Sequence, residues 1–185
     1  MKRLLNAPEL GSAIALLVVF LLFSKTLPNF SSAENLRLLA KQAAPLAIVG
    51  AGMTLVIALG GIDISVGSLV GVCSMTLGWL LASKGLPLPV ACLLATGLGA
   101  MWGGLNGLLI SRMKLPPILV TLATYAVARA AASVFNEGGS ISDLPASLTH
   151  FFDKTQFAGL PILLWIGIGV LAGAGLQTEF YRRSG

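Results

Sequence analysis

Two runs of twenty residues without a charged side chain lie on either side of a single carboxylate. The runs are Gln42 to Gly61 and Ile64 to Ser83, and the carboxylate is Asp63. Each run is long enough to cross about 30 Å of hydrocarbon as a helix. An ionisable group in such a position is costly unless it faces protein or water. The segment Gly60 to Ser68 is therefore a candidate functional site.

This segment has two interpretations. In the first, Gly60 and Gly61 break a helix, and Asp63 or Ser65 caps the helix that follows. Transporters often build their solute path where two helices meet at such a polar break. In the second, the segment is a short turn at the membrane surface, and Asp63 lies in water. Spacing alone leaves both interpretations open.

The composition indicates an integral membrane protein. The chain is 56% hydrophobic and only 10% charged, whereas soluble domains have about 25% charged residues. No run of Lys and Arg exceeds two residues, which argues against a nucleic-acid partner. Cys73 and Cys92 lie in apolar runs without metal-type spacing and are interpreted as small buried hydrophobes. His150 is interpreted as a loop residue, because no second His or paired Cys supports a metal site.

Cutting the chain at its charged residues predicts an all-α polytopic transmembrane helix bundle. The six apolar segments are Leu10 to Leu27, Gln42 to Gly61, Ile64 to Ser83, Gly85 to Ser111, Leu115 to Phe135 and Gly159 to Leu176. The first is expected to be a retained span, since no Ala-x-Ala-like cleavage site follows it. Ser31 and Glu34 fit a capping box, which predicts a helix that starts in the connector and continues into the second segment.

Two basic pairs and one long connector bear on the topology. Arg112 with Lys114, and Arg182 with Arg183, are the densest basic pairs near apolar ends, and we place both on the cytoplasmic side. The connector from Asn136 to Ala158 is expected to lie outside the membrane. It should contain a short amphipathic turn around Leu148 to Phe152.

Glycines recur every four residues at Gly99, Gly103 and Gly107. This spacing places them on one helix face and predicts close packing against a neighbouring helix. Asn106 lies inside the same stretch. An amide in a membrane helix needs partners, so Asn106 either bonds across helices or lines a wet path.

The sequence contains no recognisable catalytic or metal-binding set. Ser65 lacks the glycine two residues before it that a nucleophile elbow requires. No paired intramembrane carboxylates, no His-Cys set and no phosphate-binding glycine loop occur. We therefore expect no catalytic residue, no metal and no cofactor in this chain. Any energy coupling would come from another subunit.

Three stretches resemble motifs of one transporter family. Residues Gly52 to Ser68, GMTLVIALGGIDISVGS, closely resemble a signature of the permease subunits of bacterial ABC importers for ribose, arabinose, xylose and related monosaccharides. The run from Gly103 to Ile110 resembles the family's small-residue stretch ending in Asn-Gly. Leu115 to Leu122 resembles its Pro-x-Ile-x-Thr-Leu segment.

The resemblance implies a multi-pass subunit of the bacterial inner membrane that moves a sugar inward on ATP hydrolysed elsewhere. It implies as partners a second permease subunit (identical or a sister chain), cytoplasmic ATP-binding subunits, a periplasmic sugar-binding protein and the lipid bilayer. Asp63, Ser65 and Asn106 stand at polar motif positions of the family, and we expect Gly60, Gly61 and Ser68 to belong to the same break or translocation path.

The chain also departs from the family's pattern. Ala130 follows Arg129 where family members often have Arg-Gly, and Tyr181 replaces a glycine in a Thr-x-Phe-Gly-Arg motif. Family members continue well beyond this motif, so residues 1–185 are expected to form a single permease domain that is incomplete at its C-terminus. Two other functions stay open: a self-contained oligomeric channel or secondary carrier that uses Asp63 for ion coupling, and a truncated fragment that does not transport.

Overall fold

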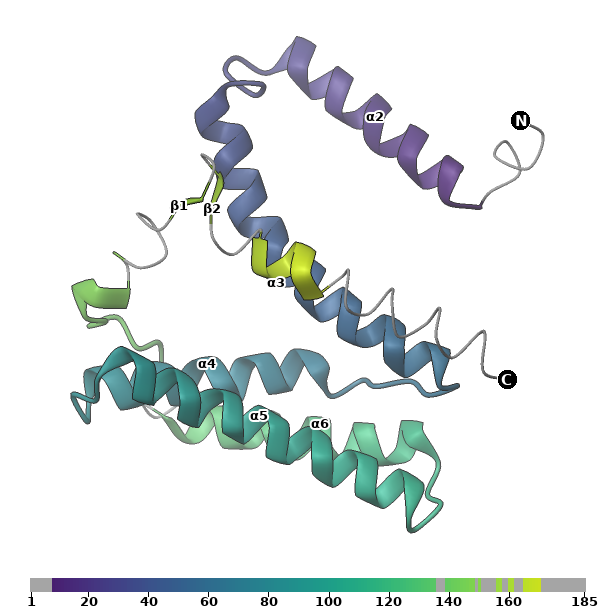
Figure 1. Ribbon diagram of the computed structural model, residues 1–185, viewed down its shortest axis with the longest axis vertical. Coiled ribbons are helices and arrows are strands. Elements are labelled where there is room, and N and C mark those ends of the chain that lie inside the picture. The colour runs from purple at the N-terminus through teal and green to yellow at the C-terminus, as the bar shows by residue number, and fades with distance from the viewer. Residues whose placement is uncertain are drawn as a thin grey trace. The chain divides into compact units, whose positions relative to one another are not determined.

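The computed structural model describes residues 8–135, 139–148, 150, 156–157, 160–161 and 165–170. This part of the chain is helical apart from one antiparallel pair of two-residue strands, so the expected all-α class is confirmed (Figure 1). The elements are α2 (Pro8–Thr26), α3 (Ala33–Ala58), α4 (Val66–Ala82), α5 (Leu88–Ser111), α6 (Pro117–Val134), β1 (Gln156–Phe157) and β2 (Leu160–Pro161).

The first five predicted apolar segments coincide with α2 to α6. By length and composition α3, α5 and α6 can each cross a membrane, while α4 and residues 10–26 of α2 form shorter apolar helices. The prediction that a helix starts in the connector and continues into the second segment is also confirmed, because α3 is continuous from Ala33 to Ala58. The sixth predicted segment is described only at residues 160–161 and 165–170.

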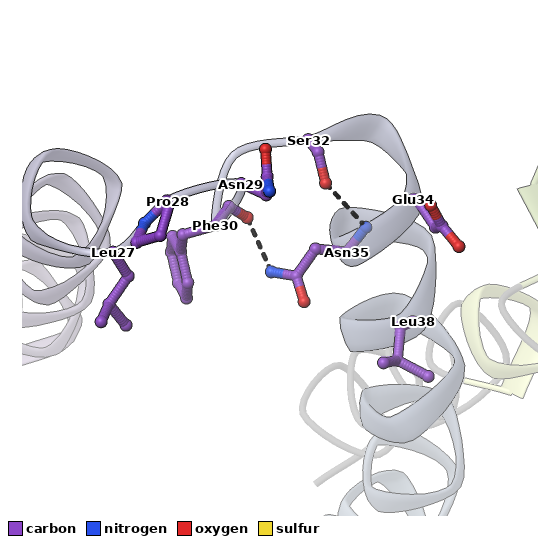
Figure 2. A pocket seen from close by; sticks show the side chains of 8 residues that line it. All are labelled: Leu27, Pro28, Asn29, Phe30, Ser32, Glu34, Asn35 and Leu38. Atoms are coloured by element: carbon purple, nitrogen blue, oxygen red, sulfur yellow. Dashed lines mark hydrogen bonds between the residues drawn. The ribbon is translucent and has the colours of Figure 1, made fainter.

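The chain divides into two compact units, Met1–Ala43 and Ala44–Gly185. In the first unit, a tight turn joins α2 to α3 (Figure 2). The backbone amide of Asn35 donates to Ser32 Oγ at 3.2 Å, and the Asn35 side chain donates to the Phe30 carbonyl at 2.6 Å. Ser32, and not the predicted Ser31, therefore caps α3, because the helix begins one residue later than the capping-box pattern indicated.

In the second unit, α4 packs against both α5 and α6. The loops that join these three helices are short, so neighbouring helices run antiparallel (Figure 1). A hydrophobic cluster forms where α4 ends and α5 begins, around Leu80, Leu81 and Ala91, and Leu148 from the connector packs against it. This packing brings the connector onto one end of the α4–α6 bundle. The opposite end, where α4 begins, carries the segment with Asp63.

The structure describes residues 139–148, 150 and 156–157 of the connector from Asn136 to Ala158. Residues 146–148 and His150 are helical, and the rest of the turn predicted around Leu148 to Phe152 lies outside the described residues. Gly78 of α4 lies close to the connector, since a Cβ at this position would be 3.4 Å from Ile141 Cδ1. The basic pair Arg182 and Arg183 lies outside the described residues.

Candidate functional site

The glycine pair ends α3 through a specific backbone motif. Gly60 has a φ of +78°, a left-handed conformation that glycine adopts without a steric cost. The Gly61 amide donates to the Val56 carbonyl at 2.9 Å, and the Gly60 amide donates to the Ile57 carbonyl at 2.9 Å. These two bonds are the Schellman pattern, which satisfies carbonyl groups at a helix C-terminus. The chain therefore leaves the helix at Gly60 with the Val56 and Ile57 carbonyls satisfied.

Asp63 organises the backbone that follows. Its Oδ1 accepts a hydrogen bond from the Ser65 backbone amide at 2.8 Å and another from the Ser65 hydroxyl at 2.6 Å. Ser65 precedes the first residue of α4, but its own side chain makes no capping bond to the helix. The Asp63 carboxylate thus fixes the position of Ser65, the residue that precedes α4. Asp side chains favour short-range turns of this kind.

Ser65 connects this turn to α5. Asn106 Nδ2 donates to Ser65 Oγ at 3.1 Å, and the two residues are 0% and 4% exposed. The only hydroxyl proton of Ser65 goes to the Asp63 carboxylate, which can only accept, so Ser65 must accept from Asn106. This requirement orients the amide: its NH₂ group faces Ser65, and its carbonyl oxygen, Oδ1, has no partner in the described part of the chain.

Thr121 joins α6 to the same segment. Its hydroxyl lies 3.2 Å from the Ile62 carbonyl and 3.4 Å from the Ile118 carbonyl, and the residue is 1% exposed. A hydroxyl on the second turn of α6 therefore satisfies a carbonyl of the non-helical segment. Hydrophobic periodicity did not single out Thr121, because a threonine hydroxyl in a helix usually bonds its own backbone. The proline pair at Pro116 and Pro117 fixes where α6 begins. It was the sequence signal that could have placed Thr121 near the segment with Asp63.

These residues surround a cavity of about 330 Å³. We call it the break cavity. Its lining residues are Val56, Leu59, Gly60, Gly61, Ile62, Asp63, Gly103, Asn106, Gly107, Ile110, Ser111, Pro117 and Thr121. Asp63 is the only ionisable side chain in this lining, so any charge the cavity presents from its side chains is negative.

The break cavity lies inside one end of the α5–α6 pair. Asn106 is five residues from the end of α5 at Ser111, and Thr121 is four residues from the start of α6 at Pro117. With a rise of 1.5 Å per residue, both are about 6–8 Å from the helix ends that the loop with Arg112 and Lys114 connects. The break cavity therefore lies neither at the middle of the bundle nor beyond its end.

The three glycines that recur every four residues in α5 do not behave alike. A Cβ at Gly99 would lie 3.3 Å from Cys73 Sγ of α4, so this position is a close helix–helix contact. A Cβ at Gly103 or Gly107 would meet nothing within 4 Å in the described residues. Both glycines line the break cavity, so the absence of their side chains leaves room for it, and close packing at these two positions stays a prediction.

Of the predicted path residues, Gly60, Gly61, Asp63 and Asn106 line the break cavity. Ser65 does not line it and joins Asp63 to Asn106 instead. Ser68 lies one turn further along α4, 7% exposed, and its hydroxyl has no partner among the described residues. Within the same part of the chain, no group of three His, Cys, Asp or Glu residues could hold a metal ion.

Comparison with known proteins bears on what this arrangement is for. Residues 35–163 match the family described as the permease component of the branched-chain amino acid transport system. The chain belongs to this permease family. All three stretches with the resemblance noted above fall within these residues, and each contributes to one site: Asp63 and Ser65 from the first, Asn106 from the second and Thr121 from the third.

Several curated relatives are permease proteins named LsrC of autoinducer 2 import systems. The protein of Enterobacter sp. is 33% identical over 94% of this chain and 50% of its own length. That of Photorhabdus luminescens is 35% identical over 98% of this chain and 55% of its own. The chain thus spans about half the length of the curated relatives it matches. No solved structure matches it significantly.

These findings confirm the resemblance to permease subunits of importers. Members of this family are transport components and not catalytic subunits. Together with the apolar helices α3, α5 and α6, they identify the chain as a membrane protein.

Proposed function

We propose that this chain is a multi-pass permease component of an ATP-driven importer in the bacterial inner membrane, and that the break cavity forms part of its solute path. The observation that carries the proposal is that all three motif stretches meet at one cavity, whose mainly apolar lining includes the polar side chains of Asp63, Asn106 and Thr121. A cavity with a few polar groups next to a broken helix is how many transporters bind solute. The residues that we assign to the helix break or the path are Gly60, Gly61, Asp63, Ser65, Ser68 and Asn106.

The proposal includes the partners that such a subunit needs. A second permease subunit, identical or a sister chain, would complete the path, and cytoplasmic ATP-binding subunits would supply the energy. A periplasmic sugar-binding protein would deliver the solute. We treat residues 1–185 as one permease domain within this assembly, with the loop that carries Arg112 and Lys114 on the cytoplasmic side.

The lining of the break cavity favours an uncharged, hydroxyl-bearing solute such as a sugar. Its only ionised side chain is a carboxylate, and the side-chain carbonyl of Asn106 is a free acceptor. Solute hydroxyl groups can donate to both. Among the described residues, the lining contains no Lys, Arg or His side chain that could pair with the carboxylate of an amino acid, which favours a neutral solute even though the family is named after amino acid transport.

Co-purification from the native membrane tests the assembly. The tagged chain would be extracted in mild detergent, and the co-eluting proteins identified by mass spectrometry, with an identically tagged unrelated multi-pass protein as the control. We expect an ATP-binding subunit specific to this bait. Its absence, with the chain intact and abundant, would refute the importer assignment. Flux of reconstituted chain driven by an ion gradient would then favour the channel or carrier.

Uptake by cells that contain the assembly tests the solute. Three labelled probes are compared: autoinducer 2, D-ribose and leucine. The control variant is Thr76→Val, because the Thr76 hydroxyl bonds only the Val72 carbonyl of its own helix, away from the cavity. We expect Asn106→Leu to reduce uptake of a hydroxylated probe while Thr76→Val leaves it unchanged. Leucine uptake that depends on this chain would overturn the proposed solute class.

A further inference from the structure

Three buried polar atoms on α4 and α5 have no partner in the described part of the chain. They are Ser68 Oγ on α4, and Trp102 Nε1 and Asn106 Oδ1 on α5. Ser68 and Asn106 are 7% and 4% exposed. Because a buried polar group without a hydrogen bond costs free energy, three of them on two helices that pack together call for polar partners.

The register of the two helices places these atoms together. Ser65 bonds Asn106, and Gly99 approaches Cys73, so eight residues along α4 correspond to seven residues in the reverse direction along α5. Ser68 is three residues beyond Ser65 and therefore lies level with residues 103 and 104, between Trp102 and Asn106 along α5. Trp102 and Asn106 are four residues apart, so they project from one face of α5.

The three atoms match the hydrogen-bonding capacity of one water molecule. The indole N–H of Trp102 can only donate, the Asn106 carbonyl can only accept, and the Ser68 hydroxyl can do either. A buried water typically makes about three hydrogen bonds to otherwise unsatisfied groups. A single apolar occupant would leave all three unsatisfied.

We propose that α4 and α5 enclose a hydrated seam, which begins at the break cavity and ends at the contact between Gly99 and Cys73. Water bound to Ser68, Trp102 and Asn106 occupies this seam. Beyond these residues the close packing of Gly99 against Cys73 closes it, since a Cβ added at Gly99 would be only 3.3 Å from the Cys73 sulfur. The seam deepens the proposed function, since it extends the path from the break cavity toward the middle of the bundle. Its existence rests on the polar atoms alone, so its test is independent of any importer partner.

X-ray radiolytic labelling of the whole chain in lipid nanodiscs tests the seam with water itself as the probe. Hydroxyl radicals form where water is present, and they oxidise nearby indole and sulfur side chains, which mass spectrometry locates. Met101 is the matched control, because it is adjacent to Trp102 in the sequence, readily oxidised, and 64% exposed on a surface that faces lipid in the proposed bundle. Each rate is normalised to that of the denatured chain.

We expect Trp102 and Cys73 to be oxidised several-fold faster than Met101. The seam is overturned if Trp102 and Cys73 react no faster than Met101 in the unmodified chain, a result that needs no variant to fold. In Ser68→Ala/Asn106→Leu, we expect the Trp102 rate to fall to that of Met101. An unchanged Trp102 oxidation rate in this variant would also refute the seam. If Trp102 of the unmodified chain is oxidised rapidly but no ATP-binding subunit co-purifies, only the proposed importer function is refuted.

Discussion

Replacing Ser65 by alanine tests the hydrogen bonds that join the break to α5. The Ser65 hydroxyl donates to Asp63 Oδ1 at 2.6 Å and accepts from Asn106 Nδ2 at 3.1 Å; Ser65 and Asn106 are buried, and Asp63 is half-buried. A hydrogen bond to a charged group contributes about 1.5–3 kcal/mol, and a neutral one about 1 kcal/mol. The Asp63 oxygen keeps its bond from the Ser65 backbone amide in the variant. We therefore expect Ser65→Ala to lower the free energy of unfolding by about 2–3 kcal/mol.

Asn106→Leu removes one of the same bonds from the other side. It also removes a buried carbonyl oxygen without a protein partner, so we expect a smaller loss, below about 1 kcal/mol. In the Ser65→Ala background the Asn106 amide has already lost its acceptor, and Asn106→Leu should then be neutral or stabilising. The double-mutant cycle should give a coupling of about 1 kcal/mol, within the range of about 0.6–1.7 kcal/mol for hydrogen bonds between membrane helices.

The assay is equilibrium unfolding of the purified chain in mixed micelles by sodium dodecyl sulfate, followed by circular dichroism. Thr76→Val is the matched control on α4, since the Thr76 hydroxyl bonds the Val72 carbonyl and shares no partner with Asn106. Thr76→Val and Asn106→Leu should be additive. The reasoning is refuted if Ser65→Ala and Asn106→Leu are also additive within about 0.3 kcal/mol, or if Asn106→Leu costs as much as Ser65→Ala.

Three further substitutions separate backbone, packing and charge. Because Gly60 has a left-handed φ, Gly60→Ala should lower the free energy of unfolding by about 1–2 kcal/mol in the same assay. Gly60→Asn should lower it less. If the Asn variant is no more stable than the Ala variant, the left-handed φ is not the cause. Gly99→Val should destabilise by about 1–3 kcal/mol through overpacking against Cys73, whereas Gly103→Leu should change stability by less than about 0.5 kcal/mol and block uptake by filling the break cavity. Equal stability losses for Gly99→Val and Gly103→Leu would disprove the distinction between a packed and an open glycine. Asp63→Leu leaves the start of α4 without its carboxylate acceptor and should reduce the yield of folded protein in the membrane more than Asp63→Asn, as measured by size-exclusion chromatography; equal yields would favour the surface turn.

The helices could be predicted well from the sequence because charge-free runs of this length have few alternatives in a membrane. The glycine pair and Asp63 were enough to predict a boundary between two helices, but spacing alone left a break inside the bundle and a turn at the membrane surface both open. The cap of α3 was predicted one residue too early, at Ser31 in place of Ser32. Ser31 and Ser32 are adjacent and fit similar capping patterns. Which of them caps α3 depends on where the turn after α2 ends.

The roles of Gly103 and Thr121 could not be derived from spacing. A glycine repeat places residues on one face, but whether that face meets a helix or a cavity depends on the register with α4. The close contact falls at Gly99 and the cavity at Gly103. In the same way, the hydroxyl of Thr121 reaches Ile62 only because α6 begins at Pro117, next to the broken segment. Both roles depend on how the helices pack in three dimensions, which residue spacing alone does not specify.

The three motif stretches have a shared physical origin in this fold. Asp63 and Ser65, Asn106, and Thr121 come from stretches separated by tens of residues, with Ser65 and Asn106 41 positions apart and Ile62 and Thr121 59 apart. Their hydrogen bonds close one polar unit around the end of α3. A non-helical backbone in a membrane must have its amide and carbonyl groups satisfied by protein or water, so a break needs such partners from its neighbours. A change at Asn106 or Thr121 would remove a hydrogen-bond partner of the first stretch, and displacement of the first stretch would remove a partner from both. The motif stretches therefore constrain one another through the helix break, whatever solute the cavity takes.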